Sequence, residues 1–146
     1  MGQITRQLFF NVPMERVWKI WTDAEKTTEW VEGVQESKLT SAVKEGKGLA
    51  WNEKCLFGKK LIQMDHEVTE WEPLKRTVIR TGLPMGAWME RIAEFKPSPQ
   101  GTEVNVSLEW DLGVVGAMIG DDKLQHMMEK SFDLTAAKWK EKAEAS

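Results

Sequence analysis

Hydrophobic and polar residues alternate at the start of the chain and then change to a helical spacing. Ile4, Leu8 and Phe10 recur among polar residues at the two-residue period of a strand with one buried face. Pro13 suits the first turn of a helix. The apolar residues around and after it follow i, i+3, i+4, i+7 spacing, and they are Met14, Val17, Trp18 and Trp21. With a further short helical segment over 24–30, the pattern predicts one strand followed by two short helices.

Between residues 34 and 112 the pattern changes to strands joined by short turns. The sequence Phe57-Gly58-Lys59-Lys60 is typical of a tight hairpin. The last strand of this region places alternate apolar side chains on one face, and they are Val104, Val106, Leu108 and Trp110. Together with the first strand, the region predicts an antiparallel meander of about seven strands.

A long amphipathic helix is expected to end the chain. At 100° per residue, one stripe carries Leu124, Met128, Ser131, Phe132, Thr135 and Trp139. A helix about 10 Å wide cannot fill the concavity of so many strands. The sequence therefore predicts an α+β fold in which a curved seven-stranded antiparallel sheet wraps around this helix. The two short helices after the first strand would plug one end and leave an internal cavity.

Composition and charge narrow the class of protein. At 146 residues the chain has the usual length of one domain, expected over residues 1–146. Its net charge of −3 is spread over interspersed acidic and basic residues, so no nucleic-acid partner is expected. No apolar run approaches the length of a membrane span, so no stable membrane insertion is expected. With one cysteine and no signal peptide, a cytoplasmic protein is expected, as a monomer or a homodimer.

Three stretches carry a resemblance to a known superfamily. They are "VPMERVWKIWTDAEKTTEWVEGV", "EVTEWEP" and the turn "FKPSPQGTEV". In this order, with a strand before them and a long helix after them, they resemble the START-like helix-grip superfamily. That superfamily includes polyketide cyclases and dehydrases, lipid-transfer domains and birch-pollen-allergen-like proteins. The resemblance covers nearly the whole chain and implies the fold more strongly than any one activity, because this fold hosts carriers, enzymes and co-chaperones.

The hairpin turn predicts which side chains share the inner face of the sheet. If Gly58 and Lys59 form the turn, Trp51 lies opposite His66 and Glu53 lies one diagonal step from that histidine. A carboxylate and an imidazole within reach in an apolar pocket form a candidate catalytic acid–base pair. The alternative is that His66 is a core histidine held by a hydrogen bond, with Glu53 near the rim.

Metal and cofactor chemistry is not expected. The triplet Asp65-His66-Glu67 lies on a strand, where neighbouring side chains point to opposite faces and cannot close on one ion. The lone Cys55 has no evident base partner and is interpreted as a small core residue. We therefore expect no metal site and no cofactor.

Further residues are candidates for binding a ligand. Inner or cavity-mouth positions are expected for Trp51, Met64, Trp110, Met118 and Met128. Flexible thioethers suit variable apolar shapes, although methionines also serve as core filler. The segment "AWMERIAEF" is ambiguous, because its alternation directs either Arg91 or Glu90 inward. An inward Arg91 would suit a ligand that carries a carboxylate.

Three functions remain open on this reading. The first is binding of a small hydrophobic molecule, lipid, polyketide-like or aromatic, between the sheet and the last helix. The second, implied by the resemblance, is a cyclase- or dehydrase-like enzyme in which Glu53 and His66 move protons. The third is a protein-binding module similar to the activators of chaperone ATPases, which requires an exposed apolar patch.

Overall fold

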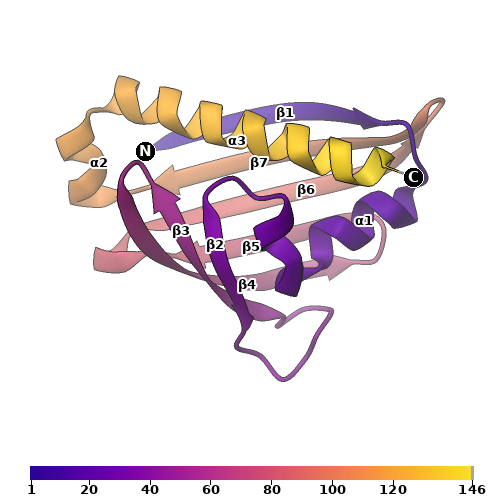
Figure 1. Cartoon of the computed structure of the whole chain (residues 1–146), viewed down its shortest axis with the longest axis horizontal. Helices are drawn as coiled ribbons and strands as arrows, with labels where there is room; N and C mark the ends of the chain where they lie inside the picture. Colours follow the sequence, from indigo (N-terminus) through magenta and orange to yellow (C-terminus); the bar gives the residue numbers. More distant parts are fainter. Residues whose placement is uncertain (146) are drawn as a thin grey trace.

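The computed structural model describes residues 1–145 and contains one sheet, three α-helices and two short 3₁₀ segments (Figure 1). In chain order the elements are β1 (Gly2–Phe10), α1 (Met14–Thr22), η1 (Ala24–Glu29), β2 (Val34–Leu39), β3 (Ala50–Phe57), β4 (Lys60–Glu72), β5 (Arg76–Gly82), η2 (Pro84–Gly86), β6 (Trp88–Ser98), β7 (Gly101–Asp111), α2 (Gly113–Ile119) and α3 (Asp121–Glu144). The predicted order of elements is confirmed. Among the described residues, no helix is both long and apolar enough to span a bilayer.

The sheet has seven strands in the order β1-β7-β6-β5-β4-β3-β2, and each neighbouring pair is antiparallel. Figure 1 shows α3 lying lengthwise across one face of the sheet, with α2 beside its N-terminal end and α1 beside its C-terminal end. The stripe predicted for α3 is turned inward, since Leu124, Met128 and Trp139 are buried. The helix therefore covers the face on which the core forms.

Polar contacts hold α3 at both edges of the sheet. Arg6 of β1 pairs with Asp133 at 2.9 Å on one side, and Lys138 pairs with Glu32 at 2.6 Å on the other. Arg16 of α1 donates hydrogen bonds to three carbonyl oxygens in the last turn of α3 and just beyond it. A cation at this end satisfies carbonyl groups that lack helical partners and complements the helix dipole.

The register of the β3–β4 hairpin agrees with the prediction. Trp51 lies opposite His66, and Glu53 lies opposite Met64. On β6 the structure resolves the ambiguous alternation, because Met89, Ala93 and Phe95 are buried and Arg91 shares their face. Arg91 therefore points into the interior.

Two groups of side chains fill the space between the sheet and α3. The tryptophan cluster, toward α1 and the C-terminal half of α3, contains Phe10, Trp18, Trp21, Trp30, Phe95 and Trp139. The methionine cluster, toward α2 and the N-terminal half of α3, contains Met64, Met89, Leu108, Trp110, Leu124 and Met128. In the tryptophan cluster the ring of Trp139 lies 4.7 Å from that of Trp21 and 5.7 Å from that of Trp30. The tryptophans near the start of the chain therefore anchor the two short helices.

One predicted inner position is wrong. Met118 is 82% exposed on α2. Gly120, whose φ is 97°, separates α2 from α3, and the residue that α2 buries is Gly116 rather than Met118. Val114 and Val115 of the same helix are also exposed.

Candidate functional site

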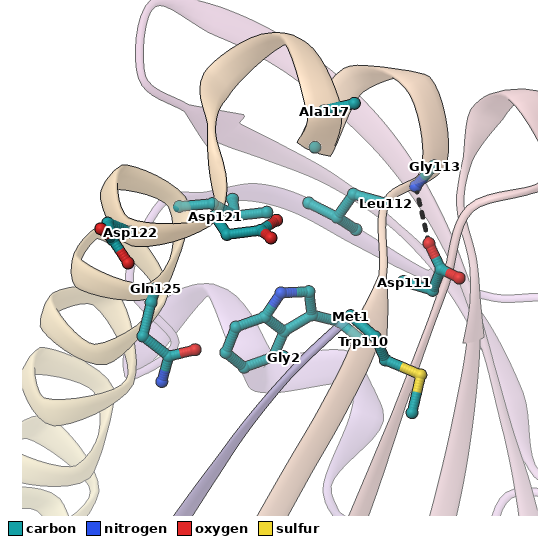
Figure 2. A pocket seen from close by; sticks show the side chains of 12 residues that line it. Met1, Gly2, Trp110, Asp111, Leu112, Gly113, Ala117, Asp121, Asp122 and Gln125 are labelled. Atoms are coloured by element: carbon teal, nitrogen blue, oxygen red, sulfur yellow. Dashed lines mark hydrogen bonds between the residues drawn. The ribbon is translucent and has the colours of Figure 1, made fainter.

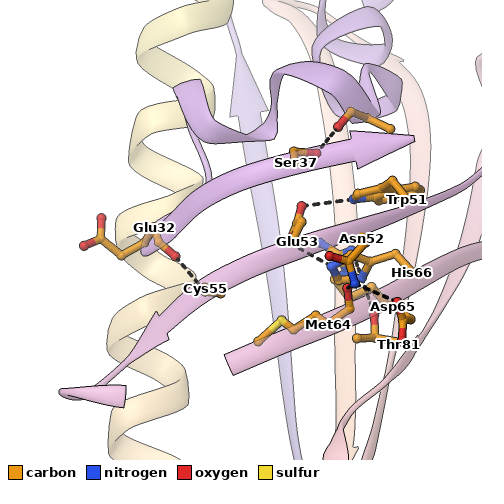
Figure 3. Close-up of polar contacts among 12 residues, drawn as sticks. Glu32, Ser37, Trp51, Asn52, Glu53, Cys55, Met64, Asp65, His66 and Thr81 are labelled. Atoms are coloured by element: carbon orange, nitrogen blue, oxygen red, sulfur yellow. Dashed lines mark hydrogen bonds and ion pairs between the residues drawn. The ribbon is translucent and has the colours of Figure 1, made fainter. Parts of the chain in front are cut away.

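The hairpin register brings Glu53 and His66 into direct contact. His66 Nε2 lies 2.8 Å from Glu53 Oε1, and each residue is only 3% exposed. The second carboxylate oxygen of Glu53 accepts a hydrogen bond from the indole N–H of Trp51 at 3.0 Å. Figure 3 shows Glu53 between these two partners, on the inner face of β3 and β4. The rings of Trp51 and His66 lie 5.0 Å apart, which covers one face of the imidazole.

The other ring nitrogen of His66 contacts residues from β5 and β6. Thr81 Oγ1 lies 2.6 Å from Nδ1, and Arg91 Nη2 lies 3.3 Å from it. A guanidinium can only donate, so Nδ1 accepts and the imidazole proton is assigned to Nε2, facing Glu53. We call Trp51, Glu53, His66, Thr81 and Arg91 the polar cluster. Sequence reasoning did not single out Thr81, although it lies opposite His66 in the β4–β5 register.

The polar cluster contains one negative and one positive charge. Burial alone would raise the pKa of Glu53, but the hydrogen bond and charge of His66 and the charge of Arg91 outweigh it and lower that pKa to about 2. Burial also lowers the pKa of His66, against the opposing influence of Glu53. Burial lowers the pKa of Arg91 too, yet a guanidinium remains protonated in proteins. At neutral pH the cluster therefore holds an ionised Glu53, a neutral His66 and a charged Arg91.

Arg91 retains unused hydrogen-bonding capacity. Its Nε is fully enclosed and has no partner, and among residues 1–145 no carboxylate lies within ion-pair distance of the guanidinium. No hydrogen bond from Nη1 to a described residue is found, and Nη1 is not among the fully enclosed unpaired atoms. The side chain is surrounded by protein and lies 5.7 Å from the ring of Trp21, yet the residue is only half-buried.

A cavity of about 300 Å³ lies at the end of the molecule where α3 begins (Figure 2). Its lining comes from the start of β1, the end of β7, α2 and the first turns of α3. Trp110 and Leu124 belong both to this lining and to the methionine cluster. The lining also includes Asp111, Asp121 and Gln125, so this cavity is more polar than the apolar cavity expected from the sequence.

A second cavity, of about 350 Å³, lies at the opposite end of α3. Its lining includes Arg16, Lys19, Lys26 and Lys142, with Trp30 at its base. Arg16 and Lys142 are already engaged, by the end of α3 and by Glu29. This surface is cationic but borders the tryptophan cluster rather than the polar cluster.

Apart from Arg91, five residues were predicted to bind a ligand, and four of them lie inside the protein. Trp51, Met64, Trp110 and Met128 are 2–9% exposed, and only Met118 lies on the surface. Met64, Trp110 and Met128 gather in the methionine cluster, whereas Trp51 packs with the tryptophan cluster and also belongs to the polar cluster.

Among the described residues, the other chemistry-bearing side chains make no hydrogen bond to the polar cluster. Asp65 and Glu67 are exposed on the opposite face of β4 from His66. Among residues 1–145 no three histidine, cysteine, aspartate or glutamate side chains gather as a metal site would require. Cys55 is buried, and burial together with nearby negative charge raises the pKa of its thiol to about 11. An enclosed, protonated thiol is a poor nucleophile.

The chain matches one protein family and resembles several solved structures. The family model described as polyketide cyclase / dehydrase and lipid transport matches residues 1–144. Among solved structures, TTHA0849 from Thermus thermophilus has a TM-score of 0.78 at 20% identity, over 97% of each chain. The Bacillus halodurans protein BH1534 has a TM-score of 0.74 at 19% identity, over 99% of this chain and 98% of that one.

Ara h 8.0201 has a TM-score of 0.71 at 13% identity, over 97% of each chain. No curated protein matches the chain. At these identities the structural likeness shows the fold alone, and it confirms the predicted helix-grip architecture.

Proposed function

Because the chain belongs to the polyketide cyclase / dehydrase and lipid transport family, we propose that it binds a small hydrophobic molecule between the sheet and α3. The methionine cluster is the apolar part of this site, and the cavity beside Trp110 is its entrance. The binding residues we propose are Met64, Trp110 and Met128, with Trp51 and Arg91 at the inner limit.

One observation carries the proposal. Arg91 points into the interior on the same face of β6 as the buried Met89 and Ala93, and its Nε is fully enclosed without a partner. Buried donors in folded proteins nearly always have partners. Four side-chain atoms of the described residues are fully enclosed without one, and among them only Arg91 Nε belongs to a charged group, which supports a binding role for this residue. The three methionines nearby can change rotamer at low cost and so make room for an apolar guest.

An uncharged fluorescent dye tests this function. We expect N-phenyl-1-naphthylamine to bind saturably, with one dye per chain and a rise in dye fluorescence. Met128→Trp fills the methionine cluster and should weaken binding about tenfold, because added volume in a packed interior is costly. Met118→Trp makes the same change on the surface and should bind like the wild type. Circular dichroism checks that both variants fold. Absence of saturable binding by the wild type, or equal weakening by both variants, would contradict the proposal.

The contact between Glu53 and His66 supports a second candidate, a cyclase- or dehydrase-like enzyme. The two groups converge at 2.8 Å, which acid–base catalysis requires. Both ring nitrogens of His66 are already hydrogen-bonded, so a substrate would have to displace Arg91 or Thr81 before it could exchange a proton with Nδ1.

The enzymatic candidate predicts proton abstraction beside a carbonyl group. We expect it to exchange the α-protons of 2-tetralone into deuterated water, which NMR follows, and His66→Gln should abolish that exchange. Exchange at the rate of buffer alone would reject catalysis of this kind while leaving ligand binding in place.

A further inference from the structure

We propose that Arg91 anchors the carboxylate of an apolar monocarboxylate ligand, and that binding of this ligand is accompanied by uptake of one proton at His66. This inference rests on the proposed binding function and specifies its ligand class. The proton comes from solvent, and no covalent bond is made or broken.

Arg91 leaves several of its hydrogen-bond donors unused. A guanidinium has five N–H groups. Of these, one is directed to a neutral nitrogen, His66 Nδ1, at the long distance of 3.3 Å, and Nε has no partner. Among the described residues, no carboxylate contacts Arg91, although burial of an isolated charge is costly. A carboxylate is the group whose geometry and charge match a guanidinium edge.

The position of Arg91 also fits a ligand that has an apolar tail. Arg91 lies at the boundary of the two clusters, because it is near the ring of Trp21 and is paired across the sheet with Leu108 of the methionine cluster. Met89 lies two residues away on the same face of β6 and is paired with Trp110, which lines the entrance cavity. At about 3.3 Å per residue, Met89 lies roughly 7 Å along the strand from Arg91. A ligand with its carboxylate at Arg91 would place its apolar tail among the methionines, toward that entrance.

The charge balance of the polar cluster would change when a carboxylate binds. Without ligand, Glu53 and Arg91 balance each other across a neutral His66. A bound carboxylate adds a second negative charge in a region of low dielectric, and protonation of His66 restores neutrality.

The neighbours of His66 Nδ1 allow this nitrogen to take up the proton. When Arg91 turns toward the ligand, it leaves His66 Nδ1, which can then carry a proton and donate it to Thr81 Oγ1, now 2.6 Å away. The other titratable groups near the imidazole do not compete for the proton. Glu53 titrates far below neutrality, Cys55 is already protonated, and Asp65 lies on the opposite face of β4.

The experiment compares octanoate with octan-1-ol, which share a chain and differ in charge. Isothermal titration calorimetry near neutral pH, in two buffers of different ionisation enthalpy, gives both affinity and protons taken up. We expect the wild type to bind octanoate at least about tenfold more tightly than the alcohol, with about one proton taken up per octanoate and none with the alcohol.

Arg91→Met should abolish the preference for the acid and the proton uptake. Arg80→Met is the matched control, because Arg80 lies on β5 with its guanidinium over the ring of Trp88 and is exposed. His66→Gln should remove the proton uptake.

The outcomes separate the two proposals. If neither compound binds, the proposed function fails and this inference fails with it. If the alcohol binds as tightly as the acid, or if Arg91→Met keeps the preference, binding stands and the carboxylate anchor is rejected. Octanoate binding without buffer-dependent heat rejects the proton uptake. Should Arg91→Met fail to fold, the acid-to-alcohol ratio and the proton count of the wild type decide the question on their own.

Discussion

Replacement of Glu53 by glutamine is the most direct perturbation of the polar cluster. The two carboxylate oxygens accept hydrogen bonds from Trp51 at 3.0 Å and from His66 at 2.8 Å. A glutamine keeps one acceptor and puts an N–H in place of the other, so one buried donor would face another. A tautomer change at His66 does not relieve this, because the proton would then face Arg91.

The magnitude follows from the loss of a buried hydrogen-bond acceptor. Leaving a buried donor without its acceptor typically costs about 1–3 kcal/mol. We expect Glu53→Gln to lower the free energy of unfolding by that amount at neutral pH, measured by urea denaturation with tryptophan fluorescence. Glu36→Gln is the control. Glu36 is exposed and pairs with Lys54 at 3.2 Å, so its loss should change stability by less than about 1 kcal/mol.

The same variant should change how stability depends on pH. The pKa of Glu53 is lowered from 4.5 to about 2 in the folded protein. A lowered carboxyl pKa stabilises the fold above the unfolded value, and this contribution, about 3 kcal/mol, is lost as pH falls from about 5 to about 2.

His66 adds a loss in the same direction, which begins as pH falls below its unfolded pKa of 6.5. Because the glutamine side chain does not titrate, the gap in stability between wild type and Glu53→Gln should narrow across the lower window. Equal stability at neutral pH, or a gap that stays constant down to pH 2, would refute the reasoning.

Three further predictions concern the scaffold. At about pH 8, iodoacetamide should alkylate Cys55 roughly a hundredfold more slowly in the folded than in the urea-unfolded protein, because burial raises its thiol pKa to about 11; similar rates would place the thiol at the surface. Gly101→Ala should lower the melting temperature in calorimetry, because its Cβ would lie 2.6 Å from the carbonyl oxygens of Phe10 and Val12, whereas Gly82→Ala, with its nearest contact at 3.9 Å, should be tolerated. Trp139→Ala should cost about 3–5 kcal/mol in urea denaturation, because this ring contacts four other aromatic rings, and a cost no larger than that of the exposed Phe9→Ala would contradict its role.

The sequence predicted that Glu53 and His66 share one face, because hairpin register and strand alternation alone determine this. A two-residue turn at Gly58-Lys59 and strict alternation along β3 and β4 are sufficient to bring Glu53 and His66 onto one face. The prediction needed no knowledge of the other strands. The same rules correctly placed Asp65 and Glu67 on the opposite face.

The rest depended on tertiary context. On β6 both faces carry apolar residues, Met89 and Ala93 on one and Trp88 and Ile92 on the other, so alternation alone could not orient Arg91. Burial of one face is decided by α3, which lies far along the chain. Met118 was misplaced for a related reason, because the sequence does not show which side of the short helix α2 faces the protein, and the residue that α2 buries is Gly116.

The two clusters also limit what the interior can accommodate. Large, stiff rings occupy the end toward α1, where Trp139 packs against Trp21 and donates a hydrogen bond to the backbone of Val17. Displacing such rings would cost packing that supports the whole fold. Methionines at the other end have several rotatable bonds and no hydrogen-bond partners to lose. We therefore expect the proposed ligand to lie toward α2, with its polar group at the polar cluster, which lies at the boundary with the rigid end.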